Sequence, residues 1–417
     1  MTAGTLNRAA KVSGESLVSG EWRETLKRWP GISYLWPRLR SWQQERQIQN
    51  EQLYYEQMAR AKSVTVLDED QVRVALQHRL AMRGVIPLVR PFGQLRLIYA
   101  SELTDWEPHQ IPPALARFGE VVTYVLSEHG FNPKDSDWPV QRNKFDEDLF
   151  AFVRAEHRKR PIDIMVAYLS SSHVAPEVIR AIAGLGIVTC AFHWDDRLSF
   201  RGRMVGGRWT GPAPLAAAYD LNLTNATASL VKYFVEGGLA IFWPLAANPD
   251  HFRPLDCPFE FDVSFIGGCY GQRPIFINYL RRQGFHVEAF GRGWPNGPLT
   301  EQEMIEVYAR SRLNLGISGV GFSMKETCLK GRDFEVPMCG ALYLTSEQPD
   351  LHRVFDVGRE VVSYRNKEEC SDRIRNLLAR PEECTRIRQA ARQRCLREHT
   401  WERRFQDLFV LTGVLDG

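Results

Sequence analysis

The sequence predicts an α/β fold in which two domains with parallel sheets face a cleft, preceded by an N-terminal helical extension. Between residues 95 and 242, short apolar segments alternate with amphipathic ones, the pattern of parallel strands joined by crossover helices. A Pro-bearing stretch at 243–256 has neither periodicity, and the alternation then begins again. Because open α/β sheets bind ligands at the carboxyl ends of their strands, we expect the cleft between the domains to hold the ligand.

Residues 1–92 form the expected helical extension. The segment 41–62 contains no Gly or Pro and is rich in Gln and Glu, which predicts a polar helix. A second helix is expected over 69–83, with Gly84 suited to its end, because apolar residues recur at every fourth position: Val72, Leu76 and Leu80. We expect this apolar face to pack on the main body. The alternative is that the extension binds a partner.

The first α/β domain is expected at 93–243. Its apolar segments predict strands at 95–101, 120–126, 162–170, 187–192 and 219–226. The amphipathic segments between them predict helices at 111–118, 143–160, 175–186 and 229–238.

The second α/β domain is expected at 244–400. Strands are predicted at 261–268, 285–291, 312–318, 341–345 and 360–364. Helices are predicted at 273–284, 301–310, 333–340, 367–379 and 382–397, the second of them opened by a Thr-Glu-Gln-Glu capping box. A last helix lies within 401–417, and we expect it to pack back on the first domain.

Composition excludes several classes of protein. The 417 residues include 53 basic and 50 acidic side chains, which argues against a dedicated nucleic-acid binder. No run of about 18 apolar residues is present, so no membrane span is expected, and the first residues lack the apolar core of a signal peptide. The eight cysteines include no CxxC pair, which predicts free thiols and a cytoplasmic protein.

The first motif that points to chemistry is the glycine turn from Ile266 to Arg273, between a strand and a helix. Gly267 and Gly268 let the backbone approach a ligand closely, and free amides at a helix start favour a phosphate. Arg273 would add a charge-assisted bond. The run is neither GxGxxG nor a Walker A loop, so it is equally compatible with a tight turn beside a surface arginine.

The second motif is the segment KGRDFEVPMCGALYLT at 330–345. Glu335 lies in an apolar setting, and a buried carboxylate needs hydrogen-bond donors such as the two hydroxyls of a ribose. Lys330 and Arg332 place two positive charges just upstream, as a diphosphate requires. An internal salt bridge between Glu335 and one of these cations is the alternative.

The third motif is His193-Trp-Asp195-Asp196, which follows a predicted strand of the first domain. A histidine and carboxylates at a strand end can bind substrate hydroxyls or move a proton. No further His or Cys lies at ligand spacing, so a metal site is not expected. A polar strand end that caps a helix is the alternative.

Several runs of the second domain together resemble one family. DVSFIGG, FGRGWPNG, LNLGIS, KGRDFEVPMCGALYLT and FDVGREVVSY are similar to the C-terminal half of CgeB-like glycosyltransferases, which resemble the group-1, retaining enzymes of the GT-B fold. The linker WPLAANPDHFRP is similar to the interdomain joint of that fold, with Ala246 in place of its usual glycine. The resemblance is most specific over 243–365, weaker over 95–242 and absent from 1–92.

The resemblance implies two Rossmann-like domains facing a cleft, with the acceptor on 93–243 and a nucleotide-sugar donor on 244–400. It implies that Glu335 binds the nucleotide ribose and that a basic residue at Arg273 binds the diphosphate. The remaining residues implied at the donor are Gly267, Gly268, Lys330 and Arg332. Group-1 enzymes carry a further Glu eight residues before the ribose ligand, and this chain has Thr327 there.

On the acceptor side, the resemblance implies catalytic roles for His193, Asp195 and Asp196. The expected function is therefore transfer of a hexose from a nucleotide-diphosphate sugar, retaining and metal-independent, with no cofactor besides this co-substrate. The acceptor stays open among a protein, a glycan, a lipid-linked saccharide, a natural product and modified DNA. Two alternatives remain: an epimerase-like enzyme of the same fold, and a non-catalytic protein with a degenerate sugar-nucleotide site.

Overall fold

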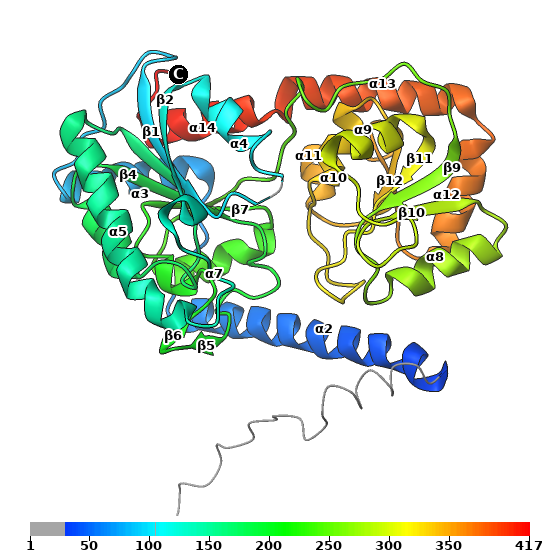
Figure 1. The fold of residues 1–417 in the computed structure, drawn as a ribbon, viewed down its shortest axis with the longest axis horizontal. Helices are drawn as coiled ribbons and strands as arrows, with labels where there is room; N and C mark the ends of the chain where they lie inside the picture. Colours follow the sequence, from blue (N-terminus) through cyan, green and yellow to red (C-terminus); the bar gives the residue numbers. More distant parts are fainter. Residues whose placement is uncertain (1–29, 105) are drawn as a thin grey trace, which may run out of the picture.

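A computed structural model describes residues 30–104 and 106–417, with side chains from residue 36 onward. It contains two parallel β-sheets, one in each of two domains that lie side by side (Figure 1). The predicted α/β fold with two Rossmann-like domains is thus confirmed.

The sheet of the N-terminal domain has six parallel strands in the order β2-β1-β3-β4-β7-β8. The strands are β1 (Leu95–Ser101), β2 (Gly119–Val125), β3 (Ile164–Tyr168), β4 (Val188–His193), β7 (Leu221–Thr224) and β8 (Ala240–Phe242). The sequence did not predict β8, because three residues are too few to show a period. A small hairpin, β5 (Met204–Val205) and β6 (Arg208–Trp209), lies between β4 and β7.

Helices cover both faces of this sheet, since successive residues of a buried strand point to opposite faces. Leu97 and Tyr99 of β1 face one hydrophobic cluster, and Ile98 and Ala100 face the other. The first cluster is covered by α3 (Glu69–Met82), α4 (Ile111–Ala116), α7 (Leu230–Val235) and α14 (Trp401–Thr412). The second is covered by α5 (Trp138–Lys159) and α6 (Pro176–Ala183). Short 3₁₀ turns occur at η1 (Leu126–His129), η2 (Ala213–Leu215) and η3 (Thr227–Ser229).

Helix α3 completes the core of the N-terminal domain. Val72, Leu76 and Leu80 are buried in the same cluster as β1 and α14. Its start carries a capping box between Asp68 and Gln71. The apolar face that the sequence placed on the extension is therefore packed, and this part of 1–92 belongs to the domain that follows it.

The sheet of the C-terminal domain has five parallel strands in the order β10-β9-β11-β12-β13. They are β9 (Phe261–Ile266), β10 (Val287–Phe290), β11 (Ser311–Leu315), β12 (Tyr343–Ser346) and β13 (Val362–Tyr364). One face packs on α8 (Arg273–Arg282) and α12 (Lys367–Leu378). The other packs on α9 (Glu301–Arg310), α10 (Arg332–Met338) and α11 (Leu351–Val354), and α13 (Pro381–Glu398) contributes to both.

The chain crosses between the domains twice, and the two crossings are joined. The first is the Pro-bearing linker after β8, and the second is the step from α13 to α14. Ala247 in the linker bridges to Thr400, and its amide donates to the carbonyl of His399 at 3.1 Å. The rings of Trp243 and Trp401 lie 5.6 Å apart beside this junction. Helix α14 thereby contributes to the core of the first domain although it follows the second in sequence.

Helix α2 (Pro30–Ala61) spans both domains along one side of the molecule (Figure 1). Toward the C-terminal domain, Ser323 donates to Glu45 at 3.0 Å. Toward the N-terminal domain, the hydroxyl of Tyr55 donates to Glu236 at 2.7 Å. Because its side chains form hydrogen bonds with both domains, α2 connects one domain to the other, and we call it the strap helix.

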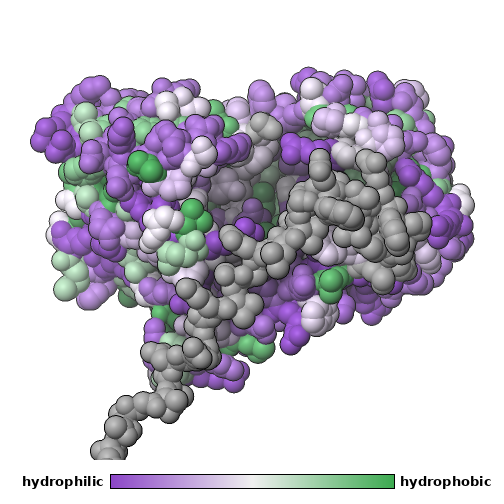
Figure 2. Space-filling view, turned by 60° about the horizontal axis from the view of Figure 1, so that its bottom comes forward, coloured by the Kyte–Doolittle hydropathy of each residue, from purple (hydrophilic) through white to green (hydrophobic). Residues whose placement is uncertain are grey.

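The surface visible in Figure 2 is mostly hydrophilic, and hydrophobic residues occur there in separate small patches. No helix within the described ranges is both long and apolar enough to cross a membrane. All eight cysteines, which lie between Cys190 and Cys395, are unpaired, and six of them are buried. The prediction of free thiols is confirmed.

Candidate functional site between the two sheets

The carboxyl ends of the two sheets meet between the domains. Asn225, directly after β7, donates to the backbone oxygen of Leu329 in the C-terminal domain at 3.0 Å. Thr227 donates to Asp350 at 2.6 Å. In folds of this type the ends of the strands are where ligands bind, so the residues on both sides of this junction form the candidate site.

On the C-terminal side, two arginines converge on the glycine turn after β9. A Cβ atom added to Gly267 would lie 3.4 Å from a guanidinium nitrogen of Arg273 and 3.4 Å from one of Arg332. Arg273 donates to the carbonyl of Gly268 at 3.2 Å, and its guanidinium carbon lies 4.2 Å from the centre of the Tyr270 ring. The two guanidinium groups therefore share one small region at the edge of the sheet.

No carboxylate pairs directly with either cation, although Glu335 and Asp333 lie close enough to Arg332 to raise its pKa against the effect of burial. Neither Arg273 nor Arg332 forms an ion pair in the part of the chain that the structure describes, and the buried Nε of Arg332 has no hydrogen-bond partner there. Burial, together with the neighbouring Arg332, lowers the pKa of Arg273 to about 10. A buried and a half-buried positive charge that lie side by side are suited to an anion.

Lys330 lies at the same edge and faces the N-terminal domain. Its Nζ donates to the thiol of Cys328 at 3.1 Å. Burial opposes the charge of Lys330, but Cys328 and Asp195 more than compensate and raise its pKa. Asp195 follows β4 of the other domain, so this pair of opposite charges faces across the junction.

Glu335 lies one helical turn beyond Arg332, inside α10. A Cβ at Gly331 would lie 2.6 Å from a carboxylate oxygen of Glu335, so the carboxylate lies directly over the backbone of Gly331. The hydroxyl of Tyr308 lies 3.4 Å from the carboxylate, and Gln110 of the N-terminal domain also bonds to it. Burial raises the pKa of Glu335 to about 7, although Arg332 opposes this shift.

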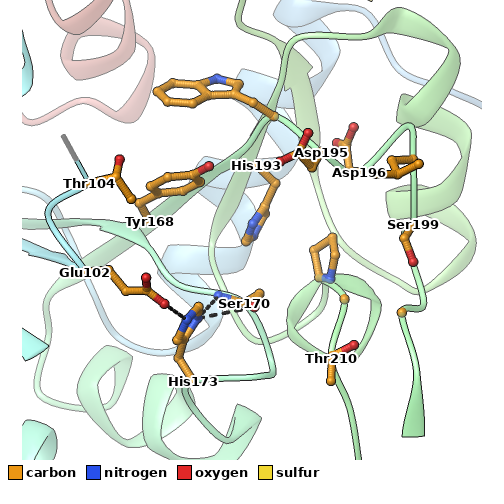
Figure 3. A pocket seen from close by; sticks show the side chains of 15 residues that line it. Glu102, Thr104, Tyr168, Ser170, His173, His193, Asp195, Asp196, Ser199 and Thr210 are labelled. Carbon is orange, nitrogen blue, oxygen red and sulfur yellow. Dashed lines mark hydrogen bonds and ion pairs between the residues drawn. The ribbon is translucent and has the colours of Figure 1, made fainter. Parts of the chain in front are cut away.

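On the N-terminal side, the loops after β1, β3 and β4 enclose a pocket of about 290 Å³ (Figure 3). His193, the last residue of β4, is 5% exposed and lines this pocket. Its Nε2 atom is buried without a hydrogen-bond partner in the described chain. Burial, with a smaller effect of His173, lowers the pKa of His193 to about 3, so the imidazole is neutral at pH 7.

The two aspartates after β4 differ in their surroundings. Asp195 is exposed and lines the pocket. Asp196 is 1% exposed, and its carboxylate accepts hydrogen bonds from Ser229 at 3.0 Å and Tyr233 at 2.9 Å. Because both of its oxygens are used inside the domain, the contacts of Asp196 are those of a residue that holds the loop in place.

Glu102 and His173 also line the pocket, and the sequence motifs did not single them out as a pair. They follow different strands, β1 and β3, and His173 Nε2 lies 2.6 Å from Glu102 Oε1. The sequence could indicate each residue singly, because each follows a buried strand. It could not indicate that the two side chains meet, because their proximity depends on the adjacency of β1 and β3 in the sheet.

The C-terminal domain is similar in sequence to a known protein family. Residues 273–409 match the family model described as glycosyl transferase-like. This range contains Arg273, Lys330, Arg332 and Glu335. A search of curated proteins found no match.

Solved structures share the fold of the whole two-domain body. A sucrose-phosphate synthase from Thermosynechococcus elongatus is 13% identical, with a TM-score of 0.55, and covers 76% of this chain and 98% of its own. A glycosyltransferase from Rickettsia africae is 9% identical, with a TM-score of 0.53, covering 77% and 98%. Anabaena HepE in complex with UDP-glucose is 11% identical, with a TM-score of 0.50, covering 76% and 98%. At these identities the likeness establishes the GT-B fold.

The structure brings the predicted donor residues together at one sheet edge: Gly267, Gly268, Arg273, Lys330 and Arg332. Glu335 lies beside them but faces the domain junction. His193 and Asp195 share the pocket on the opposite side. The roles of all these residues stay predictions. Within the described ranges, no group of three or more His, Cys, Asp or Glu side chains is placed to hold a metal ion.

Proposed function

We propose that this protein is a glycosyltransferase that moves a sugar from a nucleotide-diphosphate donor to an acceptor hydroxyl. The observation that carries the proposal is the convergence of Arg273 and Arg332 on a glycine turn, where neither forms an ion pair within the described chain and the buried Nε of Arg332 has no hydrogen-bond partner there. They belong to the segment that matches a glycosyl transferase-like family. A diphosphate is the anion that such a segment would bind.

The proposed donor site uses the charge and backbone of the C-terminal domain. Arg273 and Arg332 hold the diphosphate, and Lys330 adds a third positive charge from the junction side. Gly267 and Gly268 allow the phosphate oxygens to approach the backbone. The carboxylate of Glu335 accepts hydrogen bonds from the ribose hydroxyls, exchanging Tyr308 and Gln110 for them.

The proposed reaction exchanges one bond to the anomeric carbon for another. The bond between the sugar and the diphosphate breaks, the acceptor oxygen bonds to the anomeric carbon, and the hydroxyl proton leaves on the diphosphate. The three cations stabilise the charge that grows on the departing nucleoside diphosphate. We further propose that a hexose is transferred with retention, without a metal, and that the protein is CgeB-like.

The proposed acceptor side is the pocket of the N-terminal domain. His193 and Asp195 face substrate there, and Asp196 acts as a positioning residue through Ser229 and Tyr233. Asp195 also faces Lys330, so the pocket opens toward the proposed diphosphate site.

The test of the proposed function is a two-stage experiment. Thermal shifts measured with UDP-, GDP- and ADP-hexoses identify the donor, because a ligand that binds the native state raises its melting temperature. The chain is then incubated with that donor and a mixture of acceptors, and transfer is followed by mass spectrometry. Release of nucleoside diphosphate with a glycosylated product supports the proposal. Isomerised sugar detected by NMR without a second product would support an epimerase instead.

Two variants test whether the donor binds at the proposed site. Arg273→Ala should reduce the thermal shift at a given donor concentration, whereas Glu177→Gln, which changes an exposed residue of the N-terminal domain paired with Arg180, should leave it intact. A thermal shift that is equal in both variants would contradict the proposed donor site.

A further inference from the structure

We propose that the pocket at the carboxyl ends of β1, β3 and β4 receives an uncharged sugar unit of the acceptor and rejects phosphorylated ones. This inference rests on the proposed function and names the acceptor class for the same site. It follows from what lines the pocket, from one buried atom without a partner, and from the contrast with the donor side.

The pocket combines polar groups that can bind hydroxyls with apolar surface. No lysine or arginine is among its described lining residues. It contains the carboxylates of Glu102 and Asp195, and the ring of Tyr168 adds an apolar wall (Figure 3). Four side-chain hydroxyls also line it, those of Thr104, Ser170, Ser199 and Thr210. Trp194 provides a second aromatic ring, and such a mixture of acceptors, hydroxyls and aromatic rings matches the polar edge and apolar face of a sugar ring.

His193 supplies the buried atom that lacks a partner. Its side chain reaches toward the centre of the pocket in Figure 3, and no described group bonds to its Nε2. A buried polar atom without a hydrogen bond is costly, so a ligand group that pairs with it would restore the loss. The neutral imidazole pairs with a hydroxyl and has no charge to attract a phosphate.

Glu102 is held in position by His173. The backbone amide of Ser170 donates to Nδ1 of His173 at 3.0 Å, which assigns the proton to Nε2 and directs it to Oε1 of Glu102 at 2.6 Å. This bond lowers the pKa of Glu102, so the carboxylate is ionised at neutral pH. Its Oε2 receives no hydrogen bond from the described chain and is left for a substrate hydroxyl. His173 is thus a positioning residue, since both of its ring nitrogens are occupied.

The charge of the pocket decides between acceptor classes. Glu102 and Asp195 place two carboxylates in the lining, which contains no lysine or arginine among the described residues, so a phosphate inside the pocket would be repelled. Lys330 interacts with Asp195 from outside this lining. The cations of the junction, Arg273, Arg332 and Lys330, lie on the donor side. A pocket of about 290 Å³ is at the lower limit for a small ligand and suits one sugar unit. A sugar phosphate and a nucleic-acid backbone are therefore excluded from it.

Saturation-transfer NMR on the full chain tests the inference. The donor site is first filled with UDP, and methyl glycosides of glucose, galactose, mannose and N-acetylglucosamine are compared with glucose 6-phosphate. At least one methyl glycoside should bind, and glucose 6-phosphate should bind at least tenfold more weakly than the best of them. Binding of no methyl glycoside, or preferential binding of the phosphate, would overturn the inference.

Two variants connect the signal to the pocket. Glu102→Gln should weaken glycoside binding about tenfold, and its matched control Glu177→Gln should not change it. Ser199→Lys places a cation in the lining and should reduce the ratio of methyl glycoside affinity to glucose 6-phosphate affinity. This variant tests the charge argument even where Glu102→Gln is unstable. An unchanged ratio of the two affinities in folded Ser199→Lys would contradict the charge argument.

The same samples separate this inference from the proposed function. Binding of UDP measures the donor site, and neither pocket variant should alter it. Failure of UDP and of all nucleotide sugars to bind would contradict the proposed function. Normal UDP binding with a phosphorylated sugar preferred in the pocket would contradict only the acceptor class.

Discussion

The ammonium group of Lys232 lies 3.0 Å from the carboxylate of Glu51, although the two residues belong to α7 and α2. The side chain of Lys232 is fully buried, and that of Glu51 is 16% exposed. Lys232 also donates to the backbone oxygen of Asp196 at 3.3 Å. This ion pair therefore connects the strap helix α2 to the loop that carries Asp195 and Asp196.

Glu51→Ala should lower the free energy of unfolding by about 3 kcal/mol, because it leaves the buried charge of Lys232 without its partner. Urea unfolding followed by circular dichroism measures this loss. Asp70→Asn, which breaks an exposed ion pair with Arg73 on α3, is the control and should cost less than about 1 kcal/mol. Equal effects of the two variants would mean that α2 contributes little to the stability of the domain.

Arg273→Ala should weaken UDP binding about tenfold to a hundredfold, since a charge-assisted hydrogen bond contributes about 1.5–3 kcal/mol. The melting temperature of the unliganded protein should change little, because relief of the burial of this charge and of its repulsion from Arg332 offsets the lost contacts with Gly268 and Tyr270. Isothermal titration calorimetry and differential scanning calorimetry measure the two effects. A lower melting temperature with unchanged UDP affinity would assign Arg273 a structural role.

Glu335 should make stability fall as pH rises. Its pKa is raised from the ordinary 4.5 to about 7, so between these values the unfolded chain releases a proton that the folded one keeps. The unfolded state binds fewer protons in this window, and the contribution of Glu335 therefore decreases from pH 4.5 to 7 and is level above. This decrease amounts to up to roughly 3 kcal/mol in the free energy of unfolding, and Glu335→Gln should remove it. Urea unfolding at several pH values measures the difference. Parallel pH profiles of the two proteins would rule out the shift.

The same carboxylate should make donor binding depend on pH. If the ionised form of Glu335 accepts the ribose hydroxyls, the affinity for UDP-glucose should increase from pH 5 to 7, and binding should release a proton. UDP-glucose is the suitable probe because its phosphates do not titrate in this range. Calorimetry in buffers of different ionisation enthalpy measures the proton, and Glu335→Gln should bind more weakly at pH 7 and without proton release. An affinity independent of pH in the parent chain would contradict the ribose contact.

A chain that begins at Gly84 should not form the N-terminal domain, because it lacks α3. Leu76→Ala alone should cost about 3 kcal/mol, since Leu76 is fully buried beside β1 and α14. Val74, 64% exposed on the same helix, is the control, and Val74→Ala should cost well under 1 kcal/mol. A soluble, cooperatively folded chain from Gly84 would show that the extension is accessory after all.

Sugar transfer should survive EDTA. The proposed diphosphate site already holds the cations Arg273, Lys330 and Arg332, which supply the positive charge that a metal ion provides elsewhere. The rate of product formation in excess EDTA should equal that in buffer alone. A loss that magnesium or manganese restores would contradict a metal-independent mechanism.

Much of the fold was predictable because its signals are local. The alternation of buried strands with amphipathic helices depends on residues close in sequence, and the helix predicted at 301–310 is α9 with its capping box in place. The candidate residues at strand ends were found for the same reason. Gly267, Arg273, His193 and Asp195 each follow or end a buried strand, and parallel strands bring such positions to one edge of a sheet.

What only the tertiary structure decided concerns residues that are distant in the chain. The sequence identified the apolar face of α3 but not the cluster that it completes, and it identified a polar helix at 41–62 but not the two domains that α2 joins. It did not separate Asp195 from Asp196, because their difference depends on Ser229 and Tyr233. Nor did it pair Glu102 with His173, which meet only because β1 lies beside β3. Local periodicity determines elements, whereas the partners of a charge are set by which elements pack together.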